Sequence, residues 1–166
     1  MGVFRYYRLF ALGLGFALLA GCTRDDICTG DTPTTPLLII TFRDISNPNQ
    51  PKSVPSLLIR PADDETRVVF TGTSDSIAIP LNVNLDLTSL DFTTNSNSEE
   101  DANTDRVNIG YQREDIYVNR ACGFKTFYDA LSFERVDDVN DAWILTANIN
   151  QTRVENENQA HITIFH

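Results

Sequence analysis

Short apolar runs separated by turn sequences constrain the fold of this 166-residue chain more than any other feature. The run Leu37–Phe42 is too short for a typical helix and is rich in β-branched residues, which favours a buried strand. Residues Leu81–Leu87 alternate strictly between apolar and polar side chains, the period of a half-buried strand. Turn sequences such as Asn47–Pro51 and Gly72–Asp75 separate the runs. The pattern predicts an all-β fold.

The other expected strands follow from the same alternation and from the positions of turn residues. They cover Val54–Arg60, Arg67–Thr71, Ser76–Leu81, Leu90–Thr93, Val107–Tyr111, Ile116–Val118, Phe124–Phe133, Trp143–Ile149 and Ile162–Phe165. The segment Phe124–Phe133 also fits helical spacing, but its aromatic content and nearby turns favour a strand. Pro55 indicates an edge position or a bulge in its strand, and hairpin order is the simplest connection of the first two strands. The elements predict one antiparallel β-sandwich, Ig-like or prealbumin-like, over residues 37–166, with a small barrel as the alternative.

Two details of this prediction concern faces and loops. The spacing of Trp143, Leu145, Ala147 and Ile149 predicts that these four side chains share an inward face. Asn95–Asp105 is the most polar and acidic stretch of the chain, and we expect it to be a mobile loop.

The N-terminal segment has the order of a secretory signal peptide, with two arginines ahead of the apolar run Leu9–Ala20. That run has twelve residues, whereas a membrane-spanning helix needs about 20. Leu19–Cys22 matches the pattern that lipoprotein signal peptidase recognises, so we expect residues 1–21 to be removed and Cys22 to be lipidated. Residues 22–36 would then form the tether. A non-cleaved anchor, or an ordinary signal with an incidental cysteine, is the alternative.

The residues after Cys22 bear on location. Arg24, Asp25 and Asp26 resemble the signal, basic then acidic, that sends Bacteroidota-type lipoproteins to the outer face of the outer membrane. A merely polar linker is the alternative. Two or three acyl chains, such as palmitate, hold a protein on a membrane stably. We therefore expect an outer-membrane, lipid-anchored protein and favour the cell surface over the periplasmic face.

The charge of the mature chain limits its partners. Residues 1–21 contain two of the 13 basic residues and none of the 23 acidic ones, so the remaining 145 residues would carry a net charge of −12. Such a surface repels phosphate backbones and anionic lipid headgroups. Nucleic acid is therefore excluded as a partner, and membrane attachment depends on the acyl chains.

Cys28 and Cys122 remain once Cys22 is assigned to the lipid. An even pair in an exported protein favours a disulfide. The bridge would close a loop of 94 positions, for which the chain-entropy model gives about 4 to 5 kcal/mol. A buried free pair and a redox couple are the alternatives.

Catalytic motifs are not found in the sequence, which has no G-x-S-x-G, H-E-x-x-H or phosphate-binding glycine loop. His161 and His166 are five positions apart on an expected strand, so they point to opposite faces and cannot ligate one metal by local spacing. We predict that the protein is not an enzyme. An enzyme whose site forms only in three dimensions is the alternative.

Asp101, Asn103 and Asp105 are the best candidates for a small ligand. Their oxygen-bearing side chains occupy positions one, three and five of a calcium-loop pattern. Arg106 and Gln112 replace the glycine and the glutamate that the pattern requires at positions six and twelve. A calcium-dependent adhesion or binding module that uses residues 99–105 is thus a hypothesis, and a solvated acidic loop without Ca²⁺ is its alternative. No other cofactor is indicated.

Three segments carry a family resemblance, namely Thr32–Phe42, Tyr111–Lys125 and Asn156–Phe165. With Cys22 and its preceding residues, they resemble a domain-of-unknown-function family of small lipoproteins from flavobacteria and other Bacteroidota. The resemblance implies an envelope lipoprotein with its two remaining cysteines paired, and it conveys no activity. We therefore expect a non-enzymatic envelope lipoprotein that binds an unidentified protein or glycan partner or stabilises an envelope complex.

Overall fold

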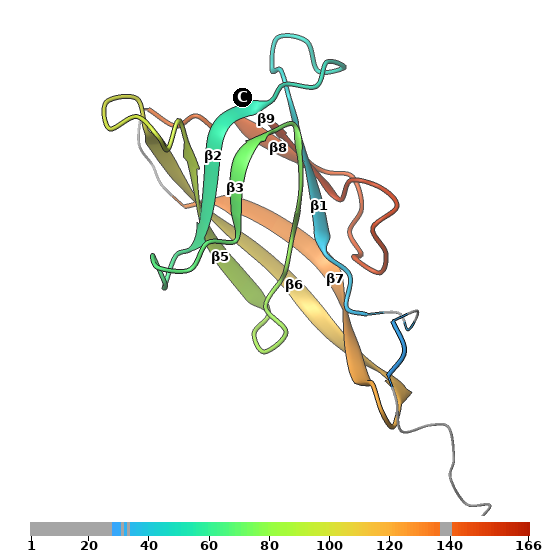
Figure 1. Cartoon of the computed structure of the whole chain (residues 1–166). Coiled ribbons are helices and arrows are strands. Elements are labelled where there is room, and N and C mark those ends of the chain that lie inside the picture. Colours follow the sequence, from blue (N-terminus) through green and yellow to red (C-terminus); the bar gives the residue numbers. More distant parts are fainter. Residues whose placement is uncertain (1–27, 31, 33, 137–140) are drawn as a thin grey trace, which may run out of the picture. The chain divides into compact units, whose positions relative to one another are not determined.

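The computed structural model describes residues 28–30, 32, 34–136 and 141–166 (Figure 1). The predicted signal peptide, Cys22 and the predicted export signal Arg24, Asp25 and Asp26 lie outside these residues. The described residues form nine strands and contain no helix. A helix able to cross a membrane is therefore not found among them.

The chain divides into two compact units. The larger comprises Thr34–Ile116 and Lys125–His166, and the smaller combines the N-terminal segment up to Pro33 with Tyr117–Phe124. The larger unit contains the two sheets of the fold. The smaller unit contains the turn between the two longest strands and is described separately below.

One sheet of the larger unit has four strands in the order β4 (Ser76–Ile79), β1 (Leu38–Arg43), β9 (Ile162–Phe165) and β8 (Thr146–Ile149). The β1–β4 and β8–β9 pairs are antiparallel, whereas β1 and β9 run parallel. All four residues of β9 are buried, and the strand lies between β1 and β8.

The other sheet has five strands in the order β3 (Phe70–Ser74), β2 (Val54–Pro61), β5 (Leu87–Thr94), β6 (Asn103–Asn119) and β7 (Gly123–Arg135) (Figure 1). The pairs β2–β3, β2–β5 and β5–β6 are antiparallel. Residues of β6 and β7 near their shared turn belong to the smaller unit.

The core lies between the two sheets and follows the alternation of the strands. The largest fully buried side chains include Tyr128, Phe42, Phe92, Leu57, Ile59, Ile109 and Ile162. In β1 the buried and partly exposed residues alternate regularly, with Leu38, Ile40 and Phe42 inward. The predicted all-β sandwich is confirmed, with one parallel strand pair in an otherwise antiparallel arrangement.

Strands β1, β2, β7 and β9 lie within two residues of their predicted bounds. Pro55 marks a bulge and not an edge, because β2 lies between β3 and β5 and its register shifts between Val54 and Leu57. Ser56 has φ 43° at this bulge. The expected hairpin of the first two strands is wrong, because β1 and β2 belong to different sheets. Strand β3 begins three residues later than predicted.

The predicted strand Leu81–Leu87 is also wrong. Residues 80–86 form a loop between β4 and β5, and β5 begins only at Leu87. The alternating residues Val83, Leu85 and Leu87 are exposed by 44, 59 and 44%. The physical reason is that side chains of β6, described below, bind the backbone groups of this loop in place of a partner strand.

The predicted inward face of Trp143–Ile149 is correct only in part, since Trp143 and Ala147 pack against the core. Ile144 is buried, whereas Leu145 and Ile149 are 55 and 39% exposed. The backbone N–H of Ile144 donates to the Asp105 carboxylate at 2.7 Å, and the N–H of Leu145 donates to the carbonyl oxygen of Phe165 at 3.0 Å. The strand itself covers only Thr146–Ile149, at the edge of its sheet.

Candidate functional site

A groove lies on the surface of the larger unit. Its volume is about 790 Å³, and we call it the 80–90 groove after the segment that forms most of its wall. The turn between β2 and β3 forms much of the rest. The lining residues are Pro61, Ala62, Asp63, Arg67, Val68, Val69, Pro80, Leu81, Asn82, Val83, Asn84, Leu85, Leu87, Thr88, Ser89, Leu90 and Arg106.

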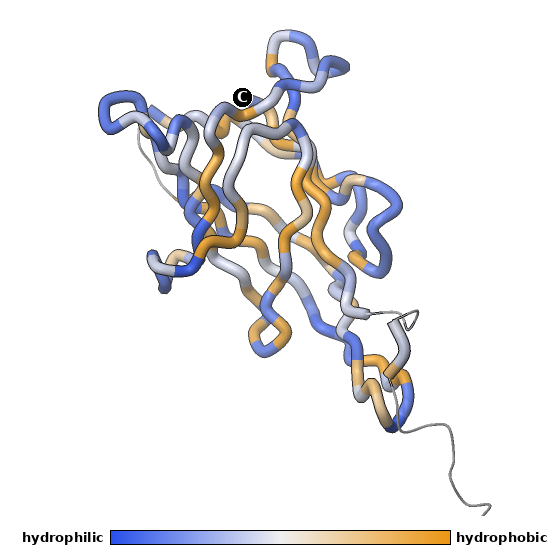
Figure 2. Tube along the Cα trace, in the orientation of Figure 1, coloured by the Kyte–Doolittle hydropathy of each residue, from blue (hydrophilic) through white to orange (hydrophobic). Residues whose placement is uncertain are grey.

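Four aliphatic side chains at the groove remain exposed. Val68 is exposed by 49%, in addition to Val83, Leu85 and Leu87 of the loop and the first residue of β5. Figure 2 shows the 80–86 loop as an apolar projection at one end of β5. Clustered exposed aliphatic groups on a soluble surface are typical of an interaction site.

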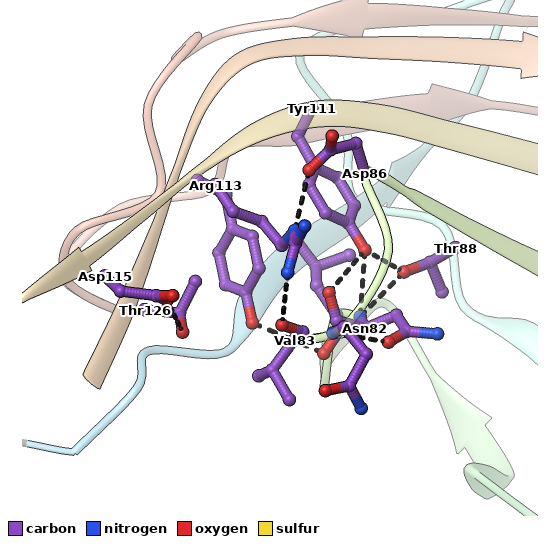
Figure 3. A network of polar contacts seen from close by, with 11 residues as sticks. Asn82, Val83, Asp86, Thr88, Tyr111, Arg113, Asp115 and Thr126 are labelled. Atoms are coloured by element: carbon purple, nitrogen blue, oxygen red, sulfur yellow. Dashed lines mark hydrogen bonds and ion pairs between the residues drawn. The ribbon is translucent and has the colours of Figure 1, made fainter. Parts of the chain in front are cut away.

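Tyr111 of β6 holds the start of the loop (Figure 3). Its hydroxyl accepts a hydrogen bond from the backbone N–H of Asn82 at 2.9 Å and donates to the carbonyl oxygen of Asn82 at 3.0 Å. The hydroxyl of Thr88 also contacts both the Tyr111 hydroxyl and the Asn82 N–H. One buried phenol therefore satisfies both backbone groups of a loop residue, as a partner strand otherwise would.

Arg113, two residues further along β6, holds the other half of the loop. Its Nε pairs with Asp86 Oδ1 at 2.7 Å, and its Nη1 donates to the carbonyl oxygen of Val83 at 2.7 Å (Figure 3). The backbone N–H of Tyr111 donates to the carbonyl oxygen of Asp86 at 3.1 Å. The polar groups of the loop thus bind β6, while its aliphatic side chains remain exposed.

The protonation states of Tyr111, Tyr128 and Arg113 favour their hydrogen bonds to the 80–86 loop. Burial raises the pKa of Tyr111 above its usual 10, and burial raises the pKa of Tyr128 to about 12. Tyr128 donates to the carbonyl oxygen of Leu81 at 3.3 Å, so both phenols remain protonated donors at neutral pH. The hydrogen bond to Asp86 raises the pKa of Arg113, which keeps its charge.

The charged side chains of the groove are two arginines and one aspartate, namely Arg67, Arg106 and Asp63. Arg106 forms a bidentate ion pair with Asp91, with distances of 2.7 and 2.8 Å. The whole chain has a net charge of −10, so a lining with more arginine than aspartate contrasts with the rest of the surface. Such a lining favours apolar ligands that carry negative charge.

The structure does not bring the side chains of the calcium pattern together around one position that a cation could occupy. Asp101 Oδ2 accepts a hydrogen bond from the Ser98 hydroxyl in the β5–β6 loop, and Asn103 donates to the carbonyl oxygen of Asp141. Asp105 is fully buried and binds the N–H of Ile144. Over the described ranges, no three His, Cys, Asp or Glu side chains gather closely enough to hold a metal ion.

His161 and His166 have separate surroundings. His161 is buried, and its Nδ1 accepts the backbone N–H of Ile39 at 3.0 Å, which links the end of the chain to β1. His166 lies edge-on to Phe42 and Trp143 at the end of β9. Burial lowers the pKa of both imidazoles below the usual 6.5, so both are neutral at pH 7.

The predicted disulfide between Cys28 and Cys122 is present, with the two Cα atoms 5.0 Å apart. Cys122 lies in the turn between β6 and β7, where Asn119 Oδ1 accepts the backbone N–H groups of Ala121 and Cys122 at 3.0 and 2.7 Å. The bridge therefore joins the first described residue of the chain to this turn. Both cysteines belong to the smaller unit.

These observations define a class, an all-β protein whose two-sheet sandwich presents an aliphatic groove and whose N-terminal segment is joined by a disulfide to a distant turn. The chain belongs to a family of unknown function, DUF6452, whose model matches residues 56–166. The match includes the groove and Cys122, whereas Cys22, Cys28 and β1 precede it. No curated protein and no solved structure matches the chain.

Sequence reasoning missed the groove because strict alternation suggested that Val83 and Leu85 would face a core. A contrary signal was present in the polar positions of the same segment. These are Asn82, Asn84 and Asp86, residue types that strands disfavour and loops prefer.

Proposed function

We propose that this protein is a lipid-anchored, non-enzymatic binding module of the bacterial outer membrane. Its binding site would be the 80–90 groove, and its partner an extended polypeptide segment with apolar side chains and acidic flanks. The observation that carries the proposal is the exposure of Val83 and Leu85 on a loop whose backbone Tyr111 and Arg113 hold in place. A surface held in its binding conformation loses little conformational entropy when a partner binds.

The size and composition of the groove support a polypeptide partner. A volume of about 790 Å³ falls within the usual range of ligand pockets, about 300 to 1,000 Å³. The lining offers valine, leucine and proline for apolar side chains and no aromatic ring on which a sugar could stack. Asparagine side chains at its wall offer hydrogen bonds to an extended backbone. A glycan is therefore the less favoured partner.

The charges of the groove select the flanks of the peptide. Arg67 is exposed, and no hydrogen bond holds its guanidinium in the described structure, while Arg106 keeps 44% of its side chain exposed beside Asp91. An acidic residue on the peptide would meet the guanidinium of Arg67, since Arg106 is already ion-paired with Asp91. Rim charges of this kind mainly set specificity and association rate.

The membrane attachment rests on the sequence. Leu19–Cys22 supports lipidation of Cys22, and Arg24, Asp25 and Asp26 support export to the cell surface. Two or three acyl chains on Cys22 would hold the domain stably without any contribution from the groove. The composition of the groove supports binding over catalysis, since its only carboxylate is Asp63.

Peptide display against the purified full-length lipoprotein tests the groove. We expect enrichment of peptides with apolar residues and Asp or Glu, and loss of this enrichment with Leu85→Ser. The matched control is Leu145→Ser, an equally exposed leucine outside the groove, which should enrich the same peptides. Arg67→Glu should exchange acidic for basic residues in the selected peptides.

Two results would contradict this proposal. Selection of the same peptides by the wild type and Leu85→Ser would place binding elsewhere. Binding to a glycan array that is lost in Leu85→Ser, with no peptide selected, would keep the groove and replace the polypeptide partner by a carbohydrate. Mass measurement of the mature N-terminal peptide independently tests lipidation of Cys22.

A further inference from the structure

We propose that the turn between β6 and β7 is a second membrane contact, which places two aromatic side chains in the lipid headgroup region. This turn, Tyr117–Phe124, is called the β6–β7 tip. The inference rests on the lipidation of Cys22 that the proposed function includes. It goes beyond that function because it assigns a lipid-binding role to side chains that neither the sandwich nor the groove uses.

The exposure of the aromatic side chains is the first observation. Phe124 is 68% exposed, the most exposed large hydrophobic side chain among the described residues, and Tyr117 is 58% exposed. Their rings contact each other edge to face, with centroids 5.4 Å apart. Figure 2 shows apolar positions at this tip. Exposed aromatic side chains that cluster at a turn indicate a surface that another molecule or a membrane covers.

The disulfide determines which surface is near. Cys122 lies within the tip and is bonded to Cys28, with the Cα atoms 5.0 Å apart. Cys28 follows the predicted lipidated Cys22 by six residues, and six residues span at most about 20 Å when fully extended. Covalent geometry therefore keeps the tip within about 25 Å of the residue that carries the acyl chains.

The chemistry of the tip suits a lipid interface. Tyrosine concentrates at the headgroup level of membranes, and phenylalanine is common on the buried face of interfacial segments. The sequence from 116 to 128 contains Arg120 and Lys125 and no acidic residue, in a chain with 23 acidic residues. Basic residues near an anionic leaflet are attracted to its headgroups. The tip thus differs locally from the rest of the chain, whose charge opposes membrane binding.

Each kind of contact has its own role. The acyl chains supply the affinity for the bilayer, since one aromatic pair buries too little area to hold a protein of 18.6 kDa alone. The disulfide brings the aromatic pair close to those chains, so the second contact forms within an already attached molecule. Its consequence is restricted rotation of the smaller unit about the lipidated residue.

Fluorescence quenching by lipids tests the proposal with Phe124→Trp in the full-length lipoprotein. The protein is reconstituted into vesicles of phosphatidylethanolamine and phosphatidylglycerol with and without bromine on the acyl chains. After subtraction of the Trp143 signal of the wild type, we expect the added emission to be blue-shifted and quenched by the brominated lipid. The matched control is Leu145→Trp, an exposed position in the larger unit, which should show neither effect.

The outcomes separate the tip from the anchor. Vesicle flotation is measured in the same samples, together with the mass of the N-terminal peptide. Flotation with unquenched, solvent-exposed emission from Phe124→Trp would overturn the tip proposal and leave the lipid anchor intact. An unmodified Cys22 and failure to float would overturn the anchor and, with it, the tip proposal.

Discussion

The 80–86 loop and the β6–β7 tip both expose apolar side chains, but they are held by different means. The loop is held by hydrogen bonds from buried and half-buried side chains of β6, whereas the tip is held by a disulfide to the N-terminal segment. The loop belongs to the larger unit and the tip to the smaller one. The exposed apolar side chains are thus held by hydrogen bonds in the larger unit and by a disulfide in the smaller one. Separate substitutions can remove either set of contacts.

The largest expected effect comes from removing the disulfide with Cys122→Ser. The bridge closes 94 positions, so its loss should lower the free energy of unfolding by about 4 kcal/mol, because the unfolded chain regains freedom. Urea denaturation measures this. Cys28→Ser should cost the same, and the double variant no more than either one. Additive losses would show that the two cysteines act independently of their bond.

The same variant sharpens the comparison between the two regions. Peptide binding by the groove should survive Cys122→Ser under native conditions, because no disulfide contributes to the contacts of Tyr111 and Arg113. Lipid quenching at Phe124→Trp should weaken, since the tip would no longer be bonded to the N-terminal segment. Loss of peptide binding in the folded variant would contradict the separation of the two regions.

The next effect comes from the loop. Tyr111→Phe removes the hydroxyl that binds both backbone groups of Asn82, and we expect a loss of about 1 to 3 kcal/mol in unfolding free energy. Tyr128→Phe removes only a longer bond of 3.3 Å to Leu81 and should cost less. Peptide affinity should fall in Tyr111→Phe, while lipid quenching at the tip stays unchanged. Equal losses of unfolding free energy in the two variants would show that the Tyr111 hydroxyl stabilises the loop no more than the Tyr128 hydroxyl does.

The contrast also explains which parts of the fold the sequence predicted. Strands β1 and β9 were predicted closely because their apolar runs are buried by neighbouring strands, and burial is what the pattern reports. Leu81–Leu87 has a more regular pattern than either of them. Alternation shows which side chains could share a face, but it does not show whether a partner strand is present. Here Tyr111 and Arg113, almost 30 residues away, took the place of that partner.

The candidate sites show the same limit. The Cys28–Cys122 pair was predictable because two cysteines in an exported chain leave few alternatives. The groove was not predictable, because it combines Val68, Leu85 and Arg106 from three separate segments. The burial of Ile144 in place of Leu145 has a similar origin, because the carboxylate of Asp105 on β6 accepts the backbone N–H of Ile144.

A smaller effect is expected from pH. Burial lowers the pKa of His161 below its usual 6.5, although the nearby Glu157 opposes the shift. The unfolded chain therefore binds more protons than the folded one between the two pKa values, and stability should fall as the pH drops below about 6.5. His161→Asn keeps a short acceptor for the N–H of Ile39 without titrating, so its melting temperature should depend less on pH between 7 and 5. An unchanged slope would assign the effect to other groups, with His166 the first candidate because burial lowers its pKa too.

The smallest effects on stability are expected at the exposed side chains themselves. Leu85→Ser and Phe124→Ser remove side chains that are 59 and 68% exposed, so each should change the unfolding free energy by less than about 0.5 kcal/mol. Their effects on binding should be opposite. Leu85→Ser should abolish peptide selection and leave the membrane contact intact, and Phe124→Ser should do the reverse, measured as tryptic cleavage after Arg120 in vesicles. If one substitution impaired both properties, the hydrogen-bonded loop and the disulfide-bonded tip would act as one functional surface.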